Sequence, residues 1–442
     1  MLDLLWRSVP ITSLELAPKL ENSTIVHCNI EKNSNNNFTE NINNDSQSFY
    51  SFSSCSESIN SAKETLQASE NRFLFAGSGG DLKIFDRFNK GKLVDSVNVL
   101  GDQRIYGIRL EPIISYSIKK DSFFFSQRAI AFGGRLFCKF IFTWELNLRC
   151  DILKTNIEFS RSRDTVSREK SIIKATDWIH DFSWIRKSIT EVSFPYFAIV
   201  YAHNFVEIRH ILNEKVLLLS QSIVECILYC ARFYGDSLDN LLVASGTVFN
   251  QALIWNPISK NLVSSLFSEN KSSIEHHIDN LKITSIQQTL PQISYTQPVL
   301  HTLNGHKGVI FGIRFSKNGL KITTTSDDRT IRVWEFRSND DLYSSNKCSI
   351  KEFVLFGHKA RIWDCLILEN YLVSISEDAT CRIWELSPDN IYKTVGNYRG
   401  GHSGKNIWSV TSDSKNGFII TGGEDGGIRN WRLDDISKRQ IG

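Results

Sequence analysis

Three segments near the end of the chain share one alternation of apolar and polar positions. They begin at Gly305, Gly357 and Gly401. Each runs through Gly-His, a strand-like stretch, a turn, a second such stretch, an acidic turn and a third stretch that ends in tryptophan. Short runs in which apolar and polar side chains alternate, bounded by turn residues, are typical of half-buried β-strands. Each segment therefore predicts three consecutive strands.

The same three-strand pattern recurs, more weakly, in the first part of the chain. These earlier units are ITSLELA from Ile11 with FLFAGSG and LKIFD, and the stretches 105–144, 179–210 and 227–255. Outer strands are expected at 92–100 and 216–222. Repeats of about 40–45 residues with Gly-His and Trp marks indicate a propeller of four-stranded blades. The sequence thus predicts an all-β, seven-bladed WD-repeat β-propeller that fills residues 1–442 as a single domain.

Four polar or aromatic side chains recur in each of the last three segments. A His precedes the first strand, a Ser or Thr lies in the second, an Asp occupies the turn and a Trp lies in the third. In WD blades these side chains form a hydrogen-bond chain, which has to be complete because a buried His or Asp without partners is unfavourable. We therefore interpret them as structural rather than catalytic. They are His306, Thr324, Asp328 and Trp334; His358, Ser374, Asp378 and Trp384; and His402, Thr421, Asp425 and Trp431.

Several stretches interrupt the repeat. Residues 31–70 are rich in Asn and Ser with few aliphatic side chains, a composition that predicts a disordered insertion inside the first blade. Looser loops are expected at 158–174, 268–298 and 338–349. The last blade lacks an obvious outer strand, so residues 1–9 or 436–441 are expected to close the ring, with the first of these preferred.

One face of the predicted propeller carries the candidate binding residues. Positions just before each first strand, and beside the turn Asp, are expected on this face, where aromatic and arginine side chains are common interface anchors. Alternatively, the two tryptophans pack between blades, and Arg329 and Lys405 are ordinary solvated surface. The candidates for partner binding are Arg361, Trp363, Asn406, Trp408, Lys405, Asp327, Arg329, Glu377 and Glu424.

Composition narrows the class of protein. With 51 basic and 48 acidic residues the net charge is only +3, without the strong basic bias of a domain that grips nucleic acid alone. Nine cysteines without a CxxC pair argue for reduced thiols inside the cell. The most apolar stretch, 194–202, is too short to cross a bilayer. We predict a cytoplasmic protein without membrane insertion.

The sequence contains only incomplete versions of nucleotide-binding and metal-binding motifs. Gly77, Gly79 and Gly80 resemble a dinucleotide fingerprint, but Leu82 stands at the sixth position, which favours a hairpin turn. His276-His277 lies in a polar loop without metal-ligand spacing. We therefore predict no catalytic, cofactor or metal site in this chain. The alternative is an enzyme whose site lies in the propeller channel.

A more specific resemblance rests on the amino-acid sequences of individual blades. The stretches VECILYCARF, GHKARIWDC, SEDATCRIWEL, GHSGKNIWSV and GGEDGGIRNW resemble the WD-repeat protein six family. The resemblance is strongest over 224–433 and thinner over 73–210. It implies the non-catalytic subunit of a tRNA 2′-O-ribose methyltransferase complex. It also implies that this subunit places tRNA while the catalytic partner uses S-adenosylmethionine to methylate the wobble nucleotide.

One departure from the family pattern leaves alternatives open. Members of the family continue past the GGEDGG blade, whereas this sequence stops at Gly442. We expect a short member, a truncated form of a longer multi-propeller protein or one part of a split protein. A second functional hypothesis is a protein-interaction scaffold in membrane trafficking or signalling without an RNA role.

Overall fold

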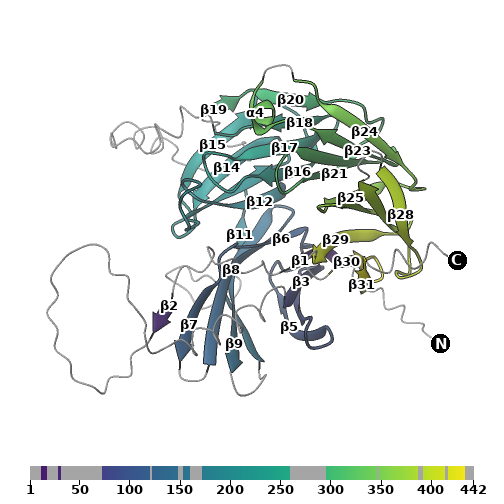
Figure 1. Cartoon of the computed structure of the whole chain (residues 1–442). Helices are drawn as coiled ribbons and strands as arrows, with labels where there is room; N and C mark the ends of the chain where they lie inside the picture. Colours follow the sequence, from purple (N-terminus) through teal and green to yellow (C-terminus); the bar gives the residue numbers. More distant parts are fainter. Residues whose placement is uncertain are drawn as a thin grey trace, which may run out of the picture.

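In the computed structural model the chain forms seven β-sheets arranged as the blades of a propeller (Figure 1). The structure describes residues 11–16, 28–30, 72–119, 122–147, 153–159, 172–258, 295–345, 348–386, 392–413 and 417–433. The prediction of an all-β, seven-bladed WD-repeat propeller is confirmed.

The first four blades follow one another along the chain except for two short strands, Cys28–Ile30 and Tyr295–Gln297, which join a neighbouring blade. Blade 1 contains β1 (Ile11–Leu16), β3 (Phe73–Ser78), β4 (Asp81–Asp86) and β5 (Lys92–Asn98). Blade 2 contains β6 (Gly107–Leu110), β8 (Ser122–Gly133), β9 (Leu136–Asn147) and β10 (Leu153–Phe159), with β2 (Cys28–Ile30), β7 (Ser115–Lys119) and β11 (Ile172–Lys174) added. Blade 3 contains β12 (Ile179–Ile185), β13 (Tyr196–Tyr201), β14 (Phe205–His210), β15 (Val216–Ser222) and β19 (Tyr295–Gln297). Blade 4 contains β16 (Leu228–Tyr234), β17 (Leu242–Thr247), β18 (Ala252–Trp255) and β20 (Val299–Leu303).

The last three blades correspond to the segments with the clearest repeat. Blade 5 contains β21 (Ile310–Phe315), β22 (Lys321–Ser326), β23 (Thr330–Glu335) and β24 (Lys351–Phe356). Blade 6 contains β25 (Ile362–Ile367), β26 (Tyr371–Ser376), β27 (Cys381–Leu386) and β28 (Tyr392–Tyr398). Blade 7 contains β29 (Ile407–Asp413), β30 (Phe418–Gly423) and β31 (Ile428–Arg432). The fourth strand of blade 7 is absent from the described residues, and both segments expected to supply it lie outside them.

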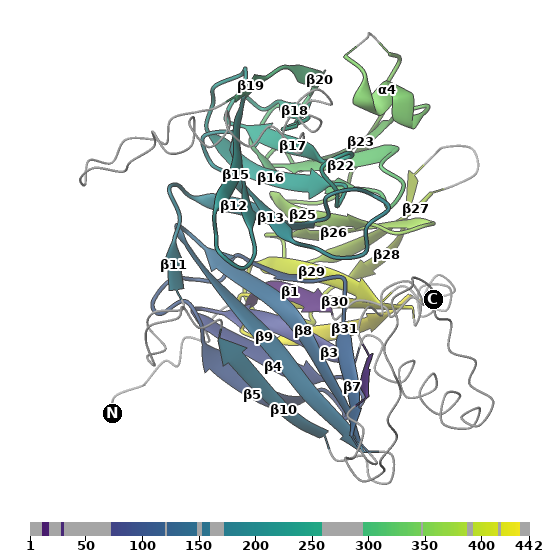
Figure 2. The same ribbon diagram turned by 90° about the vertical axis from the view of Figure 1, so that its left-hand side faces the viewer.

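The innermost strands surround the centre of the ring, which is called the channel below. They follow one another around the ring as β1, β6, β12, β16, β21, β25 and β29, and β29 lies next to β1 (Figures 1 and 2). An ion pair joins the first and last blades, because Arg87 Nη1 lies 2.9 Å from Asp413 Oδ2. Closure of the ring thus brings together residues from the two ends of the described chain.

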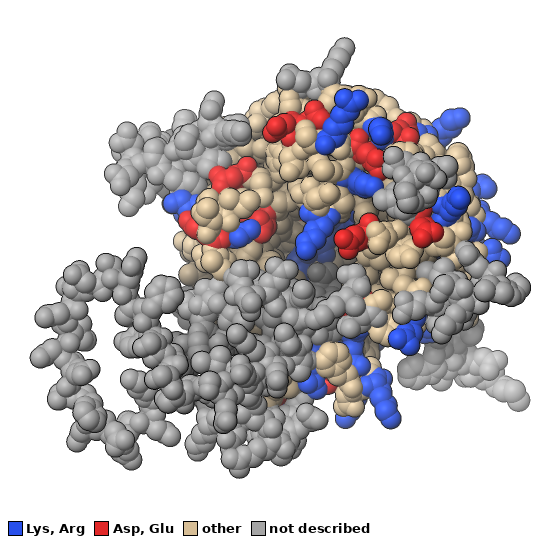
Figure 3. All heavy atoms as spheres, viewed as in Figure 1, with Lys and Arg blue, Asp and Glu red and all other residues tan. Residues whose placement is uncertain are grey.

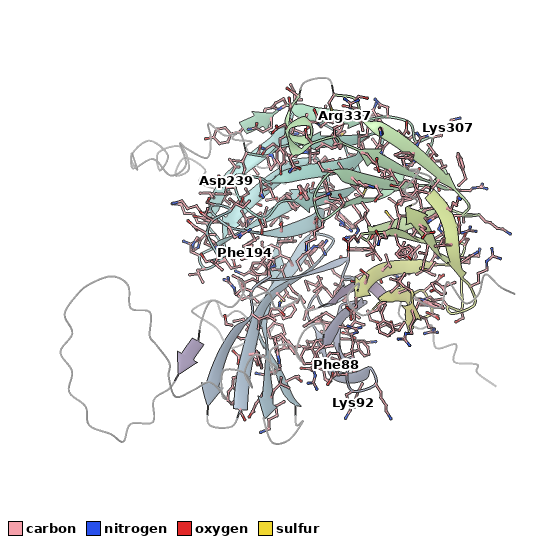
Figure 4. The ribbon with its side chains drawn as sticks, viewed as in Figure 1. Phe88, Lys92, Phe194, Asp239, Lys307 and Arg337 are labelled. Atoms are coloured by element: carbon pink, nitrogen blue, oxygen red, sulfur yellow. The ribbon has the colours of Figure 1, made fainter. Side chains whose placement is uncertain are left out.

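The hydrophobic core is divided among the spaces between neighbouring blades. Strands in the middle of a blade are covered on both faces, so all six residues of β3 and all six of β17 are buried. Phe75 of blade 1 meets Phe142 of blade 2 edge-to-face, with ring centroids 5.2 Å apart. Side chains fill these spaces, whereas Phe88 and Lys307 lie near the outside (Figure 4). Burial of whole strands explains why these two strands begin with apolar runs, FLFA in β3 and LVA in β17.

The structure corrects several expected loop boundaries. The stretch 158–174 begins inside β10 and ends in β11, and both of these strands pair with the long β9. The described end of 268–298 includes β19, which pairs in parallel with β15. The stretch 338–349 contains a short helix, α4 (Asn339–Tyr343), which is N-capped by Ser338 and buries Leu342. These short strands and the helix lie between the repeated strands, so the repeat pattern did not predict them. Residues 31–70 lie outside the described residues.

No helix in the described part of the chain is long and apolar enough to cross a membrane.

Candidate functional site at the channel mouth

The recurring His, Ser/Thr, Asp and Trp side chains form hydrogen-bond chains in blades 5, 6 and 7. In blade 5, Trp334 Nε1 donates to Thr324 Oγ1 at 3.1 Å, and Thr324 Oγ1 lies 2.8 Å from His306 Nε2. His306 Nδ1 lies 2.8 Å from Asp328 Oδ2. Blades 6 and 7 repeat the arrangement with His358, Ser374, Asp378 and Trp384, and with His402, Thr421, Asp425 and Trp431. These side chains hold the strands of a blade together and have their polar atoms already occupied.

Burial and hydrogen bonding set the protonation of these chains. Burial lowers the pKa of His358 and His402, so their imidazoles are neutral near pH 7. Burial alone would raise the pKa of Asp378, but hydrogen bonds from His358 and Thr380 outweigh it and hold that pKa well below its usual range. The same balance applies to Asp328. A neutral His therefore donates a hydrogen bond to an ionised Asp, and this bond ties the start of each blade to its acidic turn.

The glycine before each of these histidines makes room for the third strand. A Cβ atom on Gly401 would lie 2.1 Å from the ring of Trp431, and one on Gly357 would lie 3.0 Å from the ring of Trp384. Real Cβ atoms essentially never come within 3.0 Å of another atom, so the contact at Gly401 is excluded and the one at Gly357 is very tight. A Cβ atom on Gly305 would instead lie 2.2 Å from Nη1 of Arg332 in the third strand. The Gly-His pair in the sequence therefore reflects close packing against the third strand of the same blade.

Blade 4 contains a variant of the chain that sequence reasoning missed. Trp255 Nε1 donates to Ser245 Oγ at 3.2 Å, and Ser245 Oγ donates to Asn204 Oδ1 at 2.9 Å. Asn204 is buried and comes from the turn of blade 3, so it links two blades. Ser245 and Trp255 are ten residues apart, like Thr324 and Trp334 in blade 5. This spacing was the available sequence signal.

Charged side chains form a continuous series along the wall of the channel. Asp181 lies 2.5 Å from Arg109 and 3.9 Å from Arg232, and Asp364 lies 3.9 Å from Arg232 and 2.5 Å from Arg314. The alternation of sign ties blades 2 to 6 together across their inner strands. Figure 3 shows basic side chains at the central hollow of the described part. Sequence reasoning missed this series because its members come from five different repeats.

An arc of aromatic rings follows the mouth of this channel. The aromatic arc consists of Tyr229, Phe311, Trp363 and Trp408, each the second residue of the inner strand of blades 4, 5, 6 and 7. Ring centroids are 6.1 Å apart from Tyr229 to Phe311, 4.9 Å from Phe311 to Trp363 and 4.6 Å from Trp363 to Trp408. Four consecutive blades therefore share one row of rings.

The backbone explains why these side chains reach the rim. In all four strands the pairing with the next strand skips the second residue, as between Ile310 and Gly312 of β21. A residue in such a bulge is outside the regular ladder and its side chain is redirected. His180 occupies the same position in blade 3, where its Nε2 atom lies 3.0 Å from the carbonyl oxygen of Leu228 in blade 4.

Hydrogen bonds fix the blade 7 end of the arc. Trp363 Nε1 donates to Asn406 Oδ1 at 2.9 Å, and Asn406 Nδ2 donates to Glu424 Oε2 at 3.0 Å. The backbone N–H groups of Lys405 and Asn406 donate to the same oxygen at 3.2 Å. The hydrogen bond from the Asn406 side chain is the main reason why the pKa of Glu424 is lowered. Glu424 is therefore a carboxylate held in place beside the tryptophans.

An arginine bridges the acidic turns of blades 5 and 6. Arg361 Nε lies 3.3 Å from Asp327 Oδ1 and 2.9 Å from Glu377 Oε2. Its guanidinium carbon lies 5.9 Å from the ring centroid of Phe311 and 5.5 Å from that of Trp363. The guanidinium is thus held by two carboxylates and two rings.

Exposed apolar side chains extend the rim over blade 4. Ile227 is 53% exposed, Tyr229 is 50% exposed and Phe249 is 66% exposed. The backbone N–H of Val248 donates to the carbonyl oxygen of Ile227, which places the turn that carries Phe249 beside the start of β16. Contiguous exposed apolar surface of this kind marks interaction sites.

Most rim residues expected from the sequence lie together. Arg361, Trp363, Asn406, Asp327, Glu377 and Glu424 are joined by the contacts above, and Trp408 is joined through its ring. Lys405 joins through its backbone N–H, and Arg329 is exposed in its turn with φ of 67°. The two tryptophans pack against each other across blades and are also partly exposed, and partner binding by them stays a prediction. Tyr229, Phe311, Ile227 and Phe249 were missed, although their alignment with Trp363 and the acidic turns was available.

Within the described ranges, no group of three or more His, Cys, Asp or Glu side chains is placed to hold a metal ion. His276-His277 lies outside those ranges.

Comparisons with known proteins find WD repeats in this chain and a group of similar regulators. The pattern described as "WD domain, G-beta repeat" matches residues 297–335, 349–385 and 393–432. The chain is 27% identical over 367 residues to the tRNA (34-2′-O)-methyltransferase regulator WDR6 of Bos taurus, covering 81% of this chain and 26% of that protein. The Homo sapiens protein of the same name is 25% identical over 374 residues, covering 84% of this chain and 27% of that protein. At the family level, the chain matches the WD-repeat protein six regulators.

The family match extends to a more distant relative. The Drosophila melanogaster regulator of the same name is 23% identical over 304 residues, covering 65% of this chain and 27% of that protein. This chain spans about a quarter of the length of the curated relatives it matches. What the family's regulators do as whole proteins is therefore carried over only as a proposal.

Proposed function

We propose that this chain is a non-catalytic adaptor of a tRNA 2′-O-ribose methyltransferase and positions tRNA for methylation of the wobble nucleotide. The observation that carries the proposal is the match over four fifths of the chain to proteins named as regulators of a tRNA (34-2′-O)-methyltransferase. The propeller and its exposed rim support the binding role. The chain would act in the cytoplasm, together with the catalytic subunit and with tRNA bound through the complex.

The mechanism is one of placement. Blades that pack through continuous cores present fixed surfaces, so a partner enzyme and its RNA held on them meet at high effective concentration and in one orientation. The methyl group would come from S-adenosylmethionine bound by the partner. This chain would increase the rate of methylation by orienting the reacting groups.

The placement of the polar side chains supports a non-catalytic role. The His and Asp residues of blades 5, 6 and 7 are hydrogen-bonded within their blades, and His358 Nε2 and Nδ1 are both engaged. A general base needs a free nitrogen within reach of a substrate proton. These histidines serve the fold instead.

Deletion of the gene with complementation tests the proposal. We expect loss of 2′-O-methylation at the wobble nucleotide, measured by mass spectrometry of purified tRNA, and recovery on expression of the 442-residue chain. A methyltransferase should co-purify with the tagged chain. Unchanged methylation together with recovery of coat, sorting or signalling proteins would contradict the proposal and favour the trafficking or signalling scaffold.

A further inference from the structure

We propose that the aromatic arc and Glu424 bind an extended protein segment with an Arg or Lys side chain at one end and apolar side chains at the other. The inference names the kind of partner that the rim receives, and it rests on the proposed adaptor function for its biological setting. The binding itself follows from the rim's own geometry.

The rings form a surface that is continuous and partly open. Trp363 and Trp408 lie 4.6 Å apart and both remain partly exposed, and Tyr229 at the other end is 50% exposed. Three ring-to-ring steps of 4.6–6.1 Å separate the ends of the arc. An extended chain advances roughly 3.3 Å per residue, so about five residues span the arc.

The charge beside the rings selects a cation. Three carboxylates, those of Asp327, Glu377 and Glu424, flank the tryptophan end of the arc, and they outnumber the two cations beside them, Arg361 and Lys405. Arg361 is already shared between two of them. The described hydrogen bonds to Glu424 all use Oε2, which leaves Oε1 for a ligand. An Arg or Lys side chain over Trp408 would gain both an ion pair and a cation–π contact.

The same carboxylates argue against a nucleic acid. Nucleobases stack well on exposed aromatic rings. Each base, however, brings a phosphate, and phosphates gain affinity from basic rather than acidic neighbours. A protein segment can place its one cation at Glu424 without placing an anion beside it.

The other end of the arc suits apolar side chains. Ile227 and Phe249 are more than half exposed beside Tyr229, so their burial by a ligand would remove apolar surface from water. The polar end is held in advance by the hydrogen bonds from Trp363 to Asn406 and from Asn406 to Glu424. Binding to a preorganised site loses less conformational entropy. The segment is therefore expected to run from a cation over blade 7 to apolar residues over blade 4.

Pools of 12-residue synthetic peptides test the proposal on the full chain. One position in each pool is fixed as Arg, Lys, Leu or Glu and the others are randomised, and binding is measured by fluorescence polarisation. We expect the Arg and Lys pools to bind at least ten-fold more tightly than the Glu pool. We also expect Glu424→Gln, which keeps the shape of the side chain, to reduce that preference by about ten-fold.

Three further variants separate binding from folding. Trp408→Phe keeps a ring in the arc and should retain most of the binding, whereas Trp408→Ala should lose it by at least ten-fold. Glu385→Gln is the matched acidic control, because Glu385 pairs with Tyr371 at the opposite end of blade 6 and is exposed. It should change nothing. Thermal unfolding of each variant confirms that the propeller is intact.

Several outcomes would overturn the proposal. Equal binding of the Glu and Arg pools, absence of binding by every pool, or an unaltered preference in Glu424→Gln would each do so. Fluorescent bulk tRNA is the second probe, and competition by tRNA that Trp408→Ala abolishes would assign the arc to RNA instead. If the arc selects cationic peptides but no methyltransferase co-purifies, the proposed function fails alone. If the enzyme co-purifies and the arc shows no preference, this inference fails alone.

Discussion

The indole N–H of Trp363 in blade 6 donates a hydrogen bond to the side-chain oxygen of Asn406, 2.9 Å away at the start of blade 7. The neighbouring indole of Trp408 differs, because its Nε1 atom is buried without a hydrogen-bond partner. Two tryptophans whose rings lie 4.6 Å apart therefore contribute differently to stability.

Replacement of each indole by a phenyl ring should reveal this difference. Trp363→Phe removes a hydrogen bond and should lower the free energy of unfolding by about 1 kcal/mol beyond the loss from the smaller ring. Trp408→Phe removes an unsatisfied buried donor, so its loss should be smaller. Urea denaturation of the two variants measures the difference. Equal losses would show that the bond to Asn406 contributes nothing.

The hydrogen-bond chain of blade 6 should respond strongly to loss of its central hydroxyl. Ser374→Ala leaves Trp384 Nε1 and His358 Nε2 without their shared partner in a buried place. We expect a loss of about 2–4 kcal/mol in the free energy of unfolding. Ser345→Ala, at an exposed position, is the control and should change the stability by less than about 0.5 kcal/mol. Equal midpoints for the two variants would contradict the structural role of the chain.

Acidification should destabilise the propeller in the range where buried histidines take up protons. Burial lowers the pKa of His180 to about 4, whereas in the unfolded chain the value is about 6.5. The unfolded state therefore binds the proton first, so stability is complete above about pH 6.5 and falls as the pH decreases toward 4. The full effect of this residue is about 3 kcal/mol.

The variant His180→Gln isolates that contribution. Glutamine does not titrate and can donate to the carbonyl oxygen of Leu228, which His180 Nε2 contacts at 3.0 Å. The slope of unfolding free energy against pH between 6.5 and 4 should be smaller in the variant, as measured by urea denaturation across that range. A slope as steep as in the unaltered chain would assign the effect to other groups. Burial lowers the pKa of His358 and His402 in the same direction, so part of the slope should remain.

The ion pair that joins blades 1 and 7 should be worth more than an exposed pair. Asp413 is buried and Arg87 is 12% exposed at the side chain, so Asp413→Asn removes a buried charge that faces a mostly buried guanidinium. We expect a loss of about 3 kcal/mol. Arg186 and Asp236 form a more exposed pair at 2.6 Å, and Asp236→Asn should cost less than about 1 kcal/mol. A larger loss of unfolding free energy in Asp236→Asn than in Asp413→Asn would contradict a stabilising role for the ion pair between blades 1 and 7.

The blades and their hydrogen-bond chains were predictable because the residues involved are closely spaced in the sequence. Thr324 and Trp334 lie within one hairpin, and His306 precedes it closely, so the repeat itself places them together. Asn204 takes part in the chain of blade 4 from the turn of blade 3. No spacing within one blade could predict that contact, because it depends on how two blades pack.

The rim was predictable only in part for a similar reason. Sequence reasoning found Trp363 and Trp408 because they follow clear Gly-His marks. It missed Tyr229 and Phe311, which occupy the same position in neighbouring inner strands. The arc depends on the order of blades around the ring and on a bulge in each strand, and both are properties of the assembled sheets.

That bulge separates the identity of the rim residue from the pairing of the strands. The ladder skips the second residue of β12, β16, β21, β25 and β29, so its side chain is not part of strand pairing. Residues at these rim positions can therefore be substituted without changing the hydrogen bonds between strands. A library varied at Tyr229, Phe311 and Trp408 would sample new binding specificities on one unchanged framework, as loop libraries do on antibody domains.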